Sequence, residues 1–320
     1  MTMGTAERKK VSIVTPFYNE EASIQSFARA ITEMADECTQ VDFEFVCVDD
    51  GSTDNTLELL IELSKNDTRF VIIELTRNFG KEPALTAGID IATGDALVPF
   101  DADLQDPPEL IPVLIQEWSA GAEVVLAQRS RRTSDTGFKR QSAALFYKVH
   151  NRLSSVKIPE NVGDFRLIDR AVAEALKCLP ERQRFMKGLF AWVGYKPVIV
   201  QYAREPRSAG ETKFSKRKLW NFALEGLTSF STIPLKVWSY IGLGFAILTS
   251  TYAVFIIGRT LIYGVDVPGY ASILVAVLFM GSLQLISIGV LGEYVGRIYA
   301  EAKQRPPYLV RKTHRGDNEP

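Results

Sequence analysis

The segment of the chain best suited to chemistry is the acidic stretch from Asp101 to Gln105, which directly follows the apolar residues 96–100. Asp101, Asp103 and Gln105 stand at alternate positions, so an extended backbone would point all three side chains the same way. Carboxylate and amide oxygens that converge at the end of a buried strand suit a hard divalent cation such as Mg2+ or Mn2+. Such a cation typically bridges to substrate phosphates, so the segment indicates a nucleoside diphosphate site.

The next acidic residue, Asp106, has a structural explanation. It is followed by two prolines and then by Glu109, an arrangement typical of a helix N-cap and capping box. We therefore assign Asp106 to the start of a helix. Asp101 and Asp103 are not needed for that cap and keep the functional interpretation.

Alternating apolar and amphipathic segments must position these acidic residues. Apolar, often β-branched segments have the composition of buried strands at 11–17, 43–48, 70–75, 96–100 and 123–127. Amphipathic segments with helical spacing lie between them, at 23–34, 55–64, 82–92 and 107–119. Strands that alternate with helices through short connections predict an α/β domain with a parallel sheet covered on both faces. Ligands of such sheets bind outside the carboxyl ends of the strands, where Asp101 stands.

Several common functions lack their sequence signals. No Gly-x-Gly-x-x-Gly follows the first predicted strand and no P-loop Gly-Lys-Ser/Thr occurs, which argues against a dinucleotide oxidoreductase and a P-loop ATPase. The formal net charge of −1 argues against bulk nucleic-acid binding. The 3 cysteines, Cys38, Cys47 and Cys178, have neither metal-ligand spacing nor an even number, as expected in a reducing compartment.

Two long uncharged segments, 237–257 and 270–292, follow the α/β part of the chain. Each is longer than the roughly 20 residues that span a bilayer core. Basic residues cluster before the first segment and after the second, so both ends are expected in the cytoplasm and the short connection outside. The polar residues 1–10 lack the apolar core of a signal peptide. We predict a cytoplasmic domain with a two-span hairpin; two buried core helices are the alternative, which these lengths disfavour.

Two further segments have the pattern of helices that lie in the membrane interface. Residues 138–153 carry an apolar stripe flanked by lysines and arginines, and residues 219–230 place apolar side chains at helical spacing just before the first span. A helix packed on the protein core is the alternative for both.

Seven short motifs, in order along the chain, carry a resemblance to a known family. They are Pro16–Glu20, Asp49–Asp54, Arg77–Lys81, Asp101–Gln105, Gly163–Arg166, Gly210–Lys213 and Leu291–Arg297. With the two spans behind them, the chain resembles membrane-anchored family-2 glycosyltransferases that load a sugar onto a polyprenyl phosphate. It looks most like bacterial bactoprenol glucosyltransferases, relatives of dolichol-phosphate mannosyltransferase. The resemblance covers roughly residues 10–308.

The resemblance implies a Rossmann-like glycosyltransferase A-type domain with a mainly parallel sheet, followed by interfacial helices and two transmembrane helices. The expected parts are a disordered N-terminal tail (1–9), a cytoplasmic glycosyltransferase domain (10–212), a juxtamembrane amphipathic segment (213–233), a two-span transmembrane hairpin (234–298) and a cytoplasmic C-terminal tail (299–320). We therefore expect a multi-pass protein of the cytoplasmic (inner or plasma) membrane.

The resemblance also implies a donor site. Four residues match positions that hold the base and ribose of a nucleotide-sugar donor: Pro16, Tyr18, Glu20 and Asp49. Three match the motif that binds the metal, Mg2+ or Mn2+, and the donor diphosphate: Asp101, Asp103 and Gln105. Asp50 and Asp54 could instead end a strand and cap the following helix.

Further residues are implied around the acceptor and the reacting bond. Arg129 and Arg140 match basic positions that meet phosphates around the acceptor, while Arg207 and Lys213 match a pair that reaches the donor pyrophosphate from a mobile loop. Asp164 matches an acidic position at the catalytic centre, to which Asp101 and Arg129 also belong. The same basic residues could form a solvated face attracted to anionic lipid, which we prefer for the neighbouring Arg131 and Arg132.

The expected activity is that of a metal-dependent, inverting glycosyltransferase. It would move one sugar, glucose from UDP-glucose, to undecaprenyl or another polyprenyl phosphate at the cytoplasmic membrane face. Residues 183–187 do not supply the Gln-x-x-Arg-Trp motif of processive synthases, so a single transfer is expected. The alternatives are a donor of the GDP-mannose or UDP-aminoarabinose type and, more remotely, an inactive membrane scaffold or flippase component. The expected partners are the donor, the lipid and the bilayer; glycines in the spans leave homo-oligomer formation open.

Overall fold

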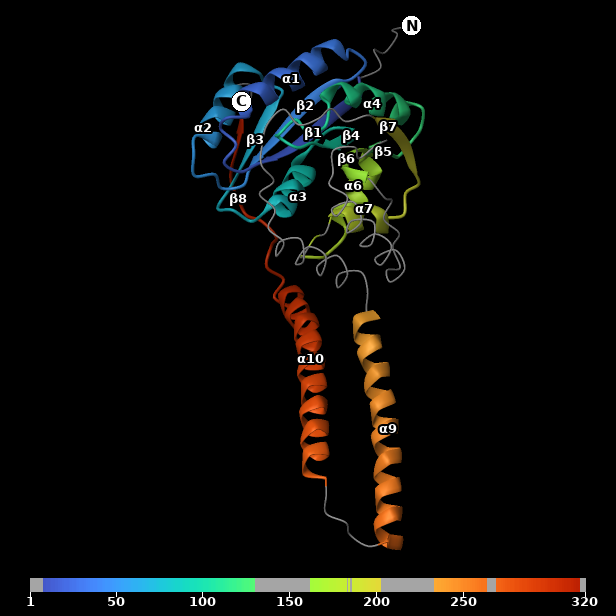
Figure 1. Cartoon of the computed structure of the whole chain (residues 1–320). Coiled ribbons are helices and arrows are strands. Elements are labelled where there is room, and N and C mark those ends of the chain that lie inside the picture. Colours follow the sequence, from blue (N-terminus) through green and yellow to red (C-terminus); the bar gives the residue numbers. More distant parts are fainter. Residues whose placement is uncertain are drawn as a thin grey trace.

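The computed structural model describes residues 8–129, 162–182, 184, 186–202, 233–263 and 269–316. This part of the chain forms an α/β domain from which two long helices project (Figure 1). The two predicted interfacial helices, 138–153 and 219–230, lie outside the described residues.

An eight-stranded sheet with the order β7-β5-β6-β4-β1-β2-β3-β8 forms the centre of the domain. Its strands are β1 (Lys10–Phe17), β2 (Asp42–Asp49), β3 (Phe70–Leu75), β4 (Ala96–Pro99), β5 (Val124–Arg129), β6 (Val162–Asp169), β7 (Pro197–Tyr202) and β8 (Val310–Arg315). β1 pairs in parallel with β2 and β4, and β2 with β3. The mainly parallel α/β sheet is therefore confirmed, with two antiparallel additions: β6 between β4 and β5, and β8 beside β3.

Helices cover both faces of the sheet. Near the predicted positions lie α1 (Ile24–Glu37), α2 (Thr56–Asn66), α3 (Lys81–Ile91) and α4 (Ile111–Ser119), and the chain adds α6 (Arg170–Lys177) and α7 (Met186–Trp192). Side chains alternate between the faces: Ile13 of β1 packs with α1 and α4, whereas Val14 packs with α3 and α6. Burial on both faces explains why the parallel strands read as continuous apolar runs.

The expected cap at Asp106 is wrong. The helix begins as a 3-10 turn, Pro108–Leu110, whose N-cap is Pro107. Asp106 is buried, and its carboxylate accepts a hydrogen bond from the hydroxyl of Tyr202 in β7. The residue ties the loop after β4 to the far edge strand of the sheet.

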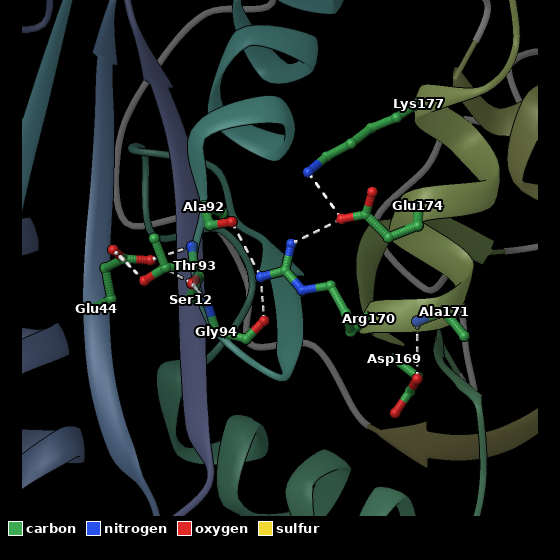
Figure 2. A network of polar contacts seen from close by, with 10 residues as sticks. All are labelled: Ser12, Glu44, Ala92, Thr93, Gly94, Asp169, Arg170, Ala171, Glu174 and Lys177. Atoms are coloured by element: carbon green, nitrogen blue, oxygen red, sulfur yellow. Dashed lines mark hydrogen bonds and ion pairs between the residues drawn. The ribbon is translucent and has the colours of Figure 1, made fainter.

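A polar network joins the strands at the amino-terminal edge of the sheet, the edge opposite the carboxyl ends of the parallel strands (Figure 2). The Glu44 carboxylate accepts hydrogen bonds from the Ser12 hydroxyl and from the backbone N–H (2.9 Å) and hydroxyl (2.8 Å) of Thr93. The Gly94 N–H donates to Ser12 Oγ at 2.8 Å, and Arg170 donates to the carbonyl oxygens of Ala92, at 3.0 Å, and Gly94.

This network fixes the entry to β4, the strand that leads to Asp101. At Gly94 a Cβ atom would lie 2.7 Å from the Ser12 nitrogen, so only glycine fits between the two chain segments. A satisfied buried network of this kind specifies one arrangement of its members. The register of β4 against β1 is therefore set at this edge, and Asp101 is positioned at the other.

The projecting helices are α9 (Ile233–Tyr263) and α10 (Tyr270–Ala302), of 31 and 33 residues. The rings of Phe245 and Phe279 meet edge to face at 5.7 Å, so the helices touch. Within the described ranges, one segment, Phe279–Ala302, is long and apolar enough to cross a membrane, so the predicted pair of spans is not confirmed.

Beyond α10 the chain returns to the domain. Its residues 310–315, expected in a C-terminal tail, form β8 against β3. The Tyr308 hydroxyl donates to Asp90 of α3 at 2.7 Å, and the Arg182 N–H donates to Glu301 at 2.9 Å. Arg311 and His314 of β8 both contact the Glu74 carboxylate of β3. The end of α10 is thus joined to the sheet at several points.

Candidate active site

A cleft of about 440 Å3 opens at the carboxyl ends of β1, β2 and β4. Its size falls in the range of small-molecule sites, roughly 300–1,000 Å3. It is lined by Pro16, Phe17, Tyr18, Glu20, Asp50, Asn78, Gly80, Lys81, Asp101, Ala102 and Asp103. Five residues expected to bind the donor therefore share one cavity: Pro16, Tyr18, Glu20, Asp101 and Asp103.

The loop after β1 is held against the loop after β2. Asn19 adopts a left-handed conformation, with φ of 53°, and its side-chain oxygen accepts the Thr53 N–H at 2.8 Å. The Glu20 N–H donates to the Thr56 hydroxyl at 2.9 Å. Tyr18, between these two bonded segments, is 46% exposed and lines the cleft with an aromatic side chain.

The two aspartates that end β2 have different surroundings. Asp49 is buried and accepts a hydrogen bond from the Ser52 N–H at 3.2 Å. Asp50 lines the cleft and accepts the N–H groups of Phe79, at 2.7 Å, and Gly80, at 2.9 Å. Burial raises the pKa of both carboxyls. Asp54 accepts the Thr56 N–H at 3.1 Å, although the N-cap residue of α2 is Asn55 and not Asp54.

Asp101 and Asp164 lie on either side of one lysine. Lys81 Nζ is 2.6 Å from Asp101 Oδ1 and 3.3 Å from Asp164 Oδ2. A second ammonium, that of Lys187 in α7, lies 3.6 Å from Asp164 Oδ1. β6, which carries Asp164, runs beside β4, and Lys81 is the first residue of α3. The structure therefore brings Asp101 and Asp164, both expected at the catalytic centre, to the same lysine.

The charges in this group act on one another. Burial raises the pKa of Asp101, and the adjacent Lys81 offsets part of that effect. Burial also acts to raise the pKa of Asp164, but Lys187, Lys81 and Arg166 outweigh it and hold the pKa below its usual range. Asp164 is therefore a carboxylate at neutral pH.

Asp101, Asp103 and Gln105 do not lie on an extended strand as expected. β4 ends at Pro99, and Leu104 has a left-handed backbone, with φ of 50°, so the segment is a turn. Asp101 and Asp103 still face the same cleft, while the Gln105 side chain donates to Asp103.

No group of three or more His, Cys, Asp or Glu side chains placed to hold a metal ion occurs among the described residues. The two cleft carboxylates, Asp101 and Asp103, offer the oxygen ligands that Mg2+ and Mn2+ prefer, and substrate phosphates would complete the coordination.

Comparison with known proteins identifies the family. Residues 12–177 match the model of glycosyl transferase family 2. The chain belongs to glycosyltransferase family 2. It is 53% identical over 308 residues to the bactoprenol glucosyl transferase of Shigella phage SfII, covering 96% of this chain and 99% of the relative. It is 52% identical over 303 residues to a prophage bactoprenol glucosyl transferase homolog of Escherichia coli, covering 95% and 99%. The resemblance to bactoprenol glucosyltransferases is confirmed.

Solved structures are more distant. The chain is 21% identical to glucosyl-3-phosphoglycerate synthase from Mycobacterium tuberculosis, solved with Mn2+ and UDP-glucose. The TM-score is 0.45, and the match covers 68% of this chain and 76% of the synthase. It is 17% identical to a mannosyltransferase from Pyrobaculum calidifontis, solved with GDP-mannose and Mn2+, with a TM-score of 0.42 and coverage of 78% and 81%.

Some expected site residues of this family-2 glycosyltransferase are not brought to the cleft by the described part of the chain. Arg129 is the last residue of β5, paired with Tyr202. Arg140, Arg207 and Lys213 lie outside the described residues. Conversely, Lys81 and Lys187 were not expected to contact Asp164. Lys81 closes the Arg77–Lys81 motif and could have been suspected there; Lys187 has no comparable signal.

Proposed function

We propose that this glycosyltransferase moves one glucosyl unit from UDP-glucose to a polyprenyl phosphate, such as undecaprenyl (bactoprenol) phosphate, at the cytoplasmic face of the membrane. The observation that carries the proposal is the identity of 52–53% to bactoprenol glucosyl transferases, which extends over nearly the full length of both chains. Similarity that includes the two long helices as well as the cleft favours a shared acceptor as well as a shared fold.

The donor would lie along the cleft. Pro16, Tyr18, Glu20 and Asp49 would receive the base and ribose, and Asp101 and Asp103, with Gln105, would hold a divalent cation at the diphosphate. When bound, that cation would neutralise the charge that develops on the departing nucleotide. Arg207 and Lys213 would add positive charge at the same diphosphate, while Arg129 and Arg140 would meet the acceptor phosphate.

The reaction would be a single displacement. An oxygen of the lipid phosphate attacks the anomeric carbon, the bond from that carbon to the diphosphate oxygen breaks, and its electron pair leaves with UDP, so the configuration inverts. A phosphate monoester has a second pKa of about 6, so the attacking oxygen needs no strong base. Asp164, held as a carboxylate by Lys81 and Lys187, would orient the acceptor or stabilise positive charge on the sugar.

The membrane arrangement is proposed as a two-span hairpin with both chain ends in the cytoplasm. It is supported by the uncharged segments 237–257 and 270–292, and by the way α9 and α10 leave the same side of the domain (Figure 1). Such an anchor would hold the cleft near the lipid headgroups, where the acceptor phosphate lies.

The test is to measure UDP release by the full-length protein in detergent, with and without undecaprenyl phosphate. Release that requires the lipid, together with a β-linked product by NMR from the α-linked donor, is expected. Equal release without lipid would indicate a hydrolase, and an α-linked product would contradict the single displacement.

A further inference from the structure

In the cleft the ammonium of Lys81 pairs with a carboxylate oxygen of Asp101, the residue proposed to hold the divalent cation. Its Nζ lies 2.6 Å from Asp101 Oδ1, and both residues line the cleft together with Asp103. Without a positive charge at this point, the carboxylates of Asp101, Asp103 and Asp164 would repel one another in partly buried surroundings. Lys81 supplies that charge from within the chain.

The backbone of Lys81 is fixed, but its side chain has room to move. The preceding Gly80 has φ of 103° and donates its N–H to Asp50 at 2.9 Å, which secures the start of α3. The Lys81 side chain is 47% exposed, and four rotatable bonds separate its ammonium from this anchor. The ammonium already has a second partner in Asp164, at 3.3 Å, so it keeps an acidic partner when it leaves Asp101.

We propose that Lys81 is an internal counter-ion that competes with the divalent cation for Asp101 and turns to Asp164 and the donor phosphates when the cation binds. This inference rests on the proposed function, because the cation belongs to the donor site. Two consequences follow. The cation alone binds weakly, since it must displace a charged group, and donor and cation bind cooperatively, since the donor phosphates give the released ammonium a new partner.

The inference is tested by binding of Mn2+ alone, measured from the EPR signal of free Mn2+ with the full-length protein in detergent. Lys81→Met removes one positive charge within a few ångströms of the site, so Mn2+ affinity should rise about tenfold. The increase in Mn2+ affinity on adding UDP should shrink in the same variant. Lys81→Arg retains the charge and should stay close to wild type.

Lys187→Met is the matched control, because Lys187 also faces Asp164 but lies on another element, α7, and its ion pair is with Asp164. It should change Mn2+ affinity less than Lys81→Met does. In an Asp101→Asn background the effect of Lys81→Met on Mn2+ affinity should shrink, because the oxygen for which ammonium and cation compete no longer carries charge and only the repulsion between the two cations remains. Lys81→Gln provides the same comparison should the methionine variant not fold.

Unchanged or weaker Mn2+ binding in a folded Lys81→Met protein would overturn the inference and leave Lys81 as a bridge between α3, β4 and β6. If Asp101→Asn binds Mn2+ as tightly as wild type, the cation assignment of the proposed function fails and this inference fails with it. An error in the sugar or the lipid alters neither measurement, so the two kinds of failure are distinguishable.

Discussion

The carboxylate of Asp50 and the backbone N–H of Gly80 are joined by a 2.9 Å hydrogen bond that connects the end of β2 to the start of α3. The same carboxylate accepts the Phe79 N–H at 2.7 Å. Gly51 has φ of 68°, and a Cβ atom at this position would lie 2.4 Å from the Arg77 carbonyl carbon. Because glycine has no Cβ atom, the two turns can pack directly against each other. Asp50 therefore shapes the wall from which Lys81 reaches Asp101.

Replacing Asp50 by alanine should weaken donor binding and lower the melting temperature. Two partly buried N–H groups, those of Phe79 and Gly80, would lose their acceptor, at a cost of up to about 1–3 kcal/mol each. Donor affinity can be measured by calorimetry and stability by thermal denaturation. Asp54→Ala is the control, since Asp54 belongs to the same motif but bonds Thr56 at the start of α2. Equal effects of both changes on donor affinity would contradict the role given to Asp50.

Asp164→Asn should reduce transfer by about 100-fold or more while leaving donor affinity within about threefold of wild type, because it removes a charge that acts on the reacting centre. Single-turnover transfer and donor binding, measured separately, check the two parts. Asp42→Asn, at the start of β2 on the opposite edge, should alter neither. Near-normal turnover in Asp164→Asn would remove its charge from the mechanism.

Stability should depend on the ionisation of Glu82. Burial, and then the nearby Asp164, raise the pKa of this carboxyl from its ordinary 4.5 to about 7 in the folded protein. Between these two values the folded state binds more protons than the unfolded state, so this group makes stability fall as pH rises from about 4.5 to about 7, by at most about 1.4 kcal/mol per pH unit. Below that window its contribution is fully present, and above it is lost.

Glu82→Gln cannot ionise and can still accept the Met186 N–H that Glu82 accepts at 3.3 Å. Its melting temperature should exceed that of wild type increasingly as pH rises from 5 to 7. Glu62→Gln, on the exposed face of α2, is the control and should follow wild type. Parallel pH profiles for Glu82→Gln and wild type would show that Glu82 does not titrate in this window.

Tyr308→Phe should destabilise the domain by about 1 kcal/mol, because it removes the hydroxyl that donates to Asp90 at 2.7 Å. The expected fall in melting temperature is a few degrees. Tyr299→Phe is the matched control, since Tyr299 lies exposed on α10. If both variants melt at the wild-type temperature, the contact between α3 and the segment after α10 contributes nothing measurable.

The first half of the domain was predictable because its signals are local. Runs such as 11–17 and 70–75 are apolar on both faces, which distinguishes buried parallel strands, and the intervening segments have helical spacing. β8 could not be predicted in this way. Its residues, Val310–Arg315, are mostly polar and exposed, and they join the sheet through pairing with β3, more than two hundred residues earlier in the chain.

Site residues that directly follow a strand could be placed from the sequence, whereas contacts between side chains of different elements could not. Asp101 and Asp103 could be placed at the carboxyl edge because Val98 and its neighbours form a buried strand. The turn at Leu104 was missed because a positive φ at leucine has no sequence signal. The contacts of Asp164 with Lys81 and Lys187 depend on packing of β6, α3 and α7, which no local pattern encodes.

The most direct test of the account is sugar transfer from labelled UDP-glucose, UDP-galactose and GDP-mannose to undecaprenyl phosphate by the full-length protein. Each donor would be tested with Mn2+, with Mg2+ and with a chelator. We expect lipid-linked glucose from UDP-glucose when a divalent cation is present, and loss of the product with the chelator or in Asp103→Ala. Transfer from GDP-mannose alone would contradict the donor, and undiminished transfer from UDP-glucose with the chelator would contradict the cation site at Asp101 and Asp103.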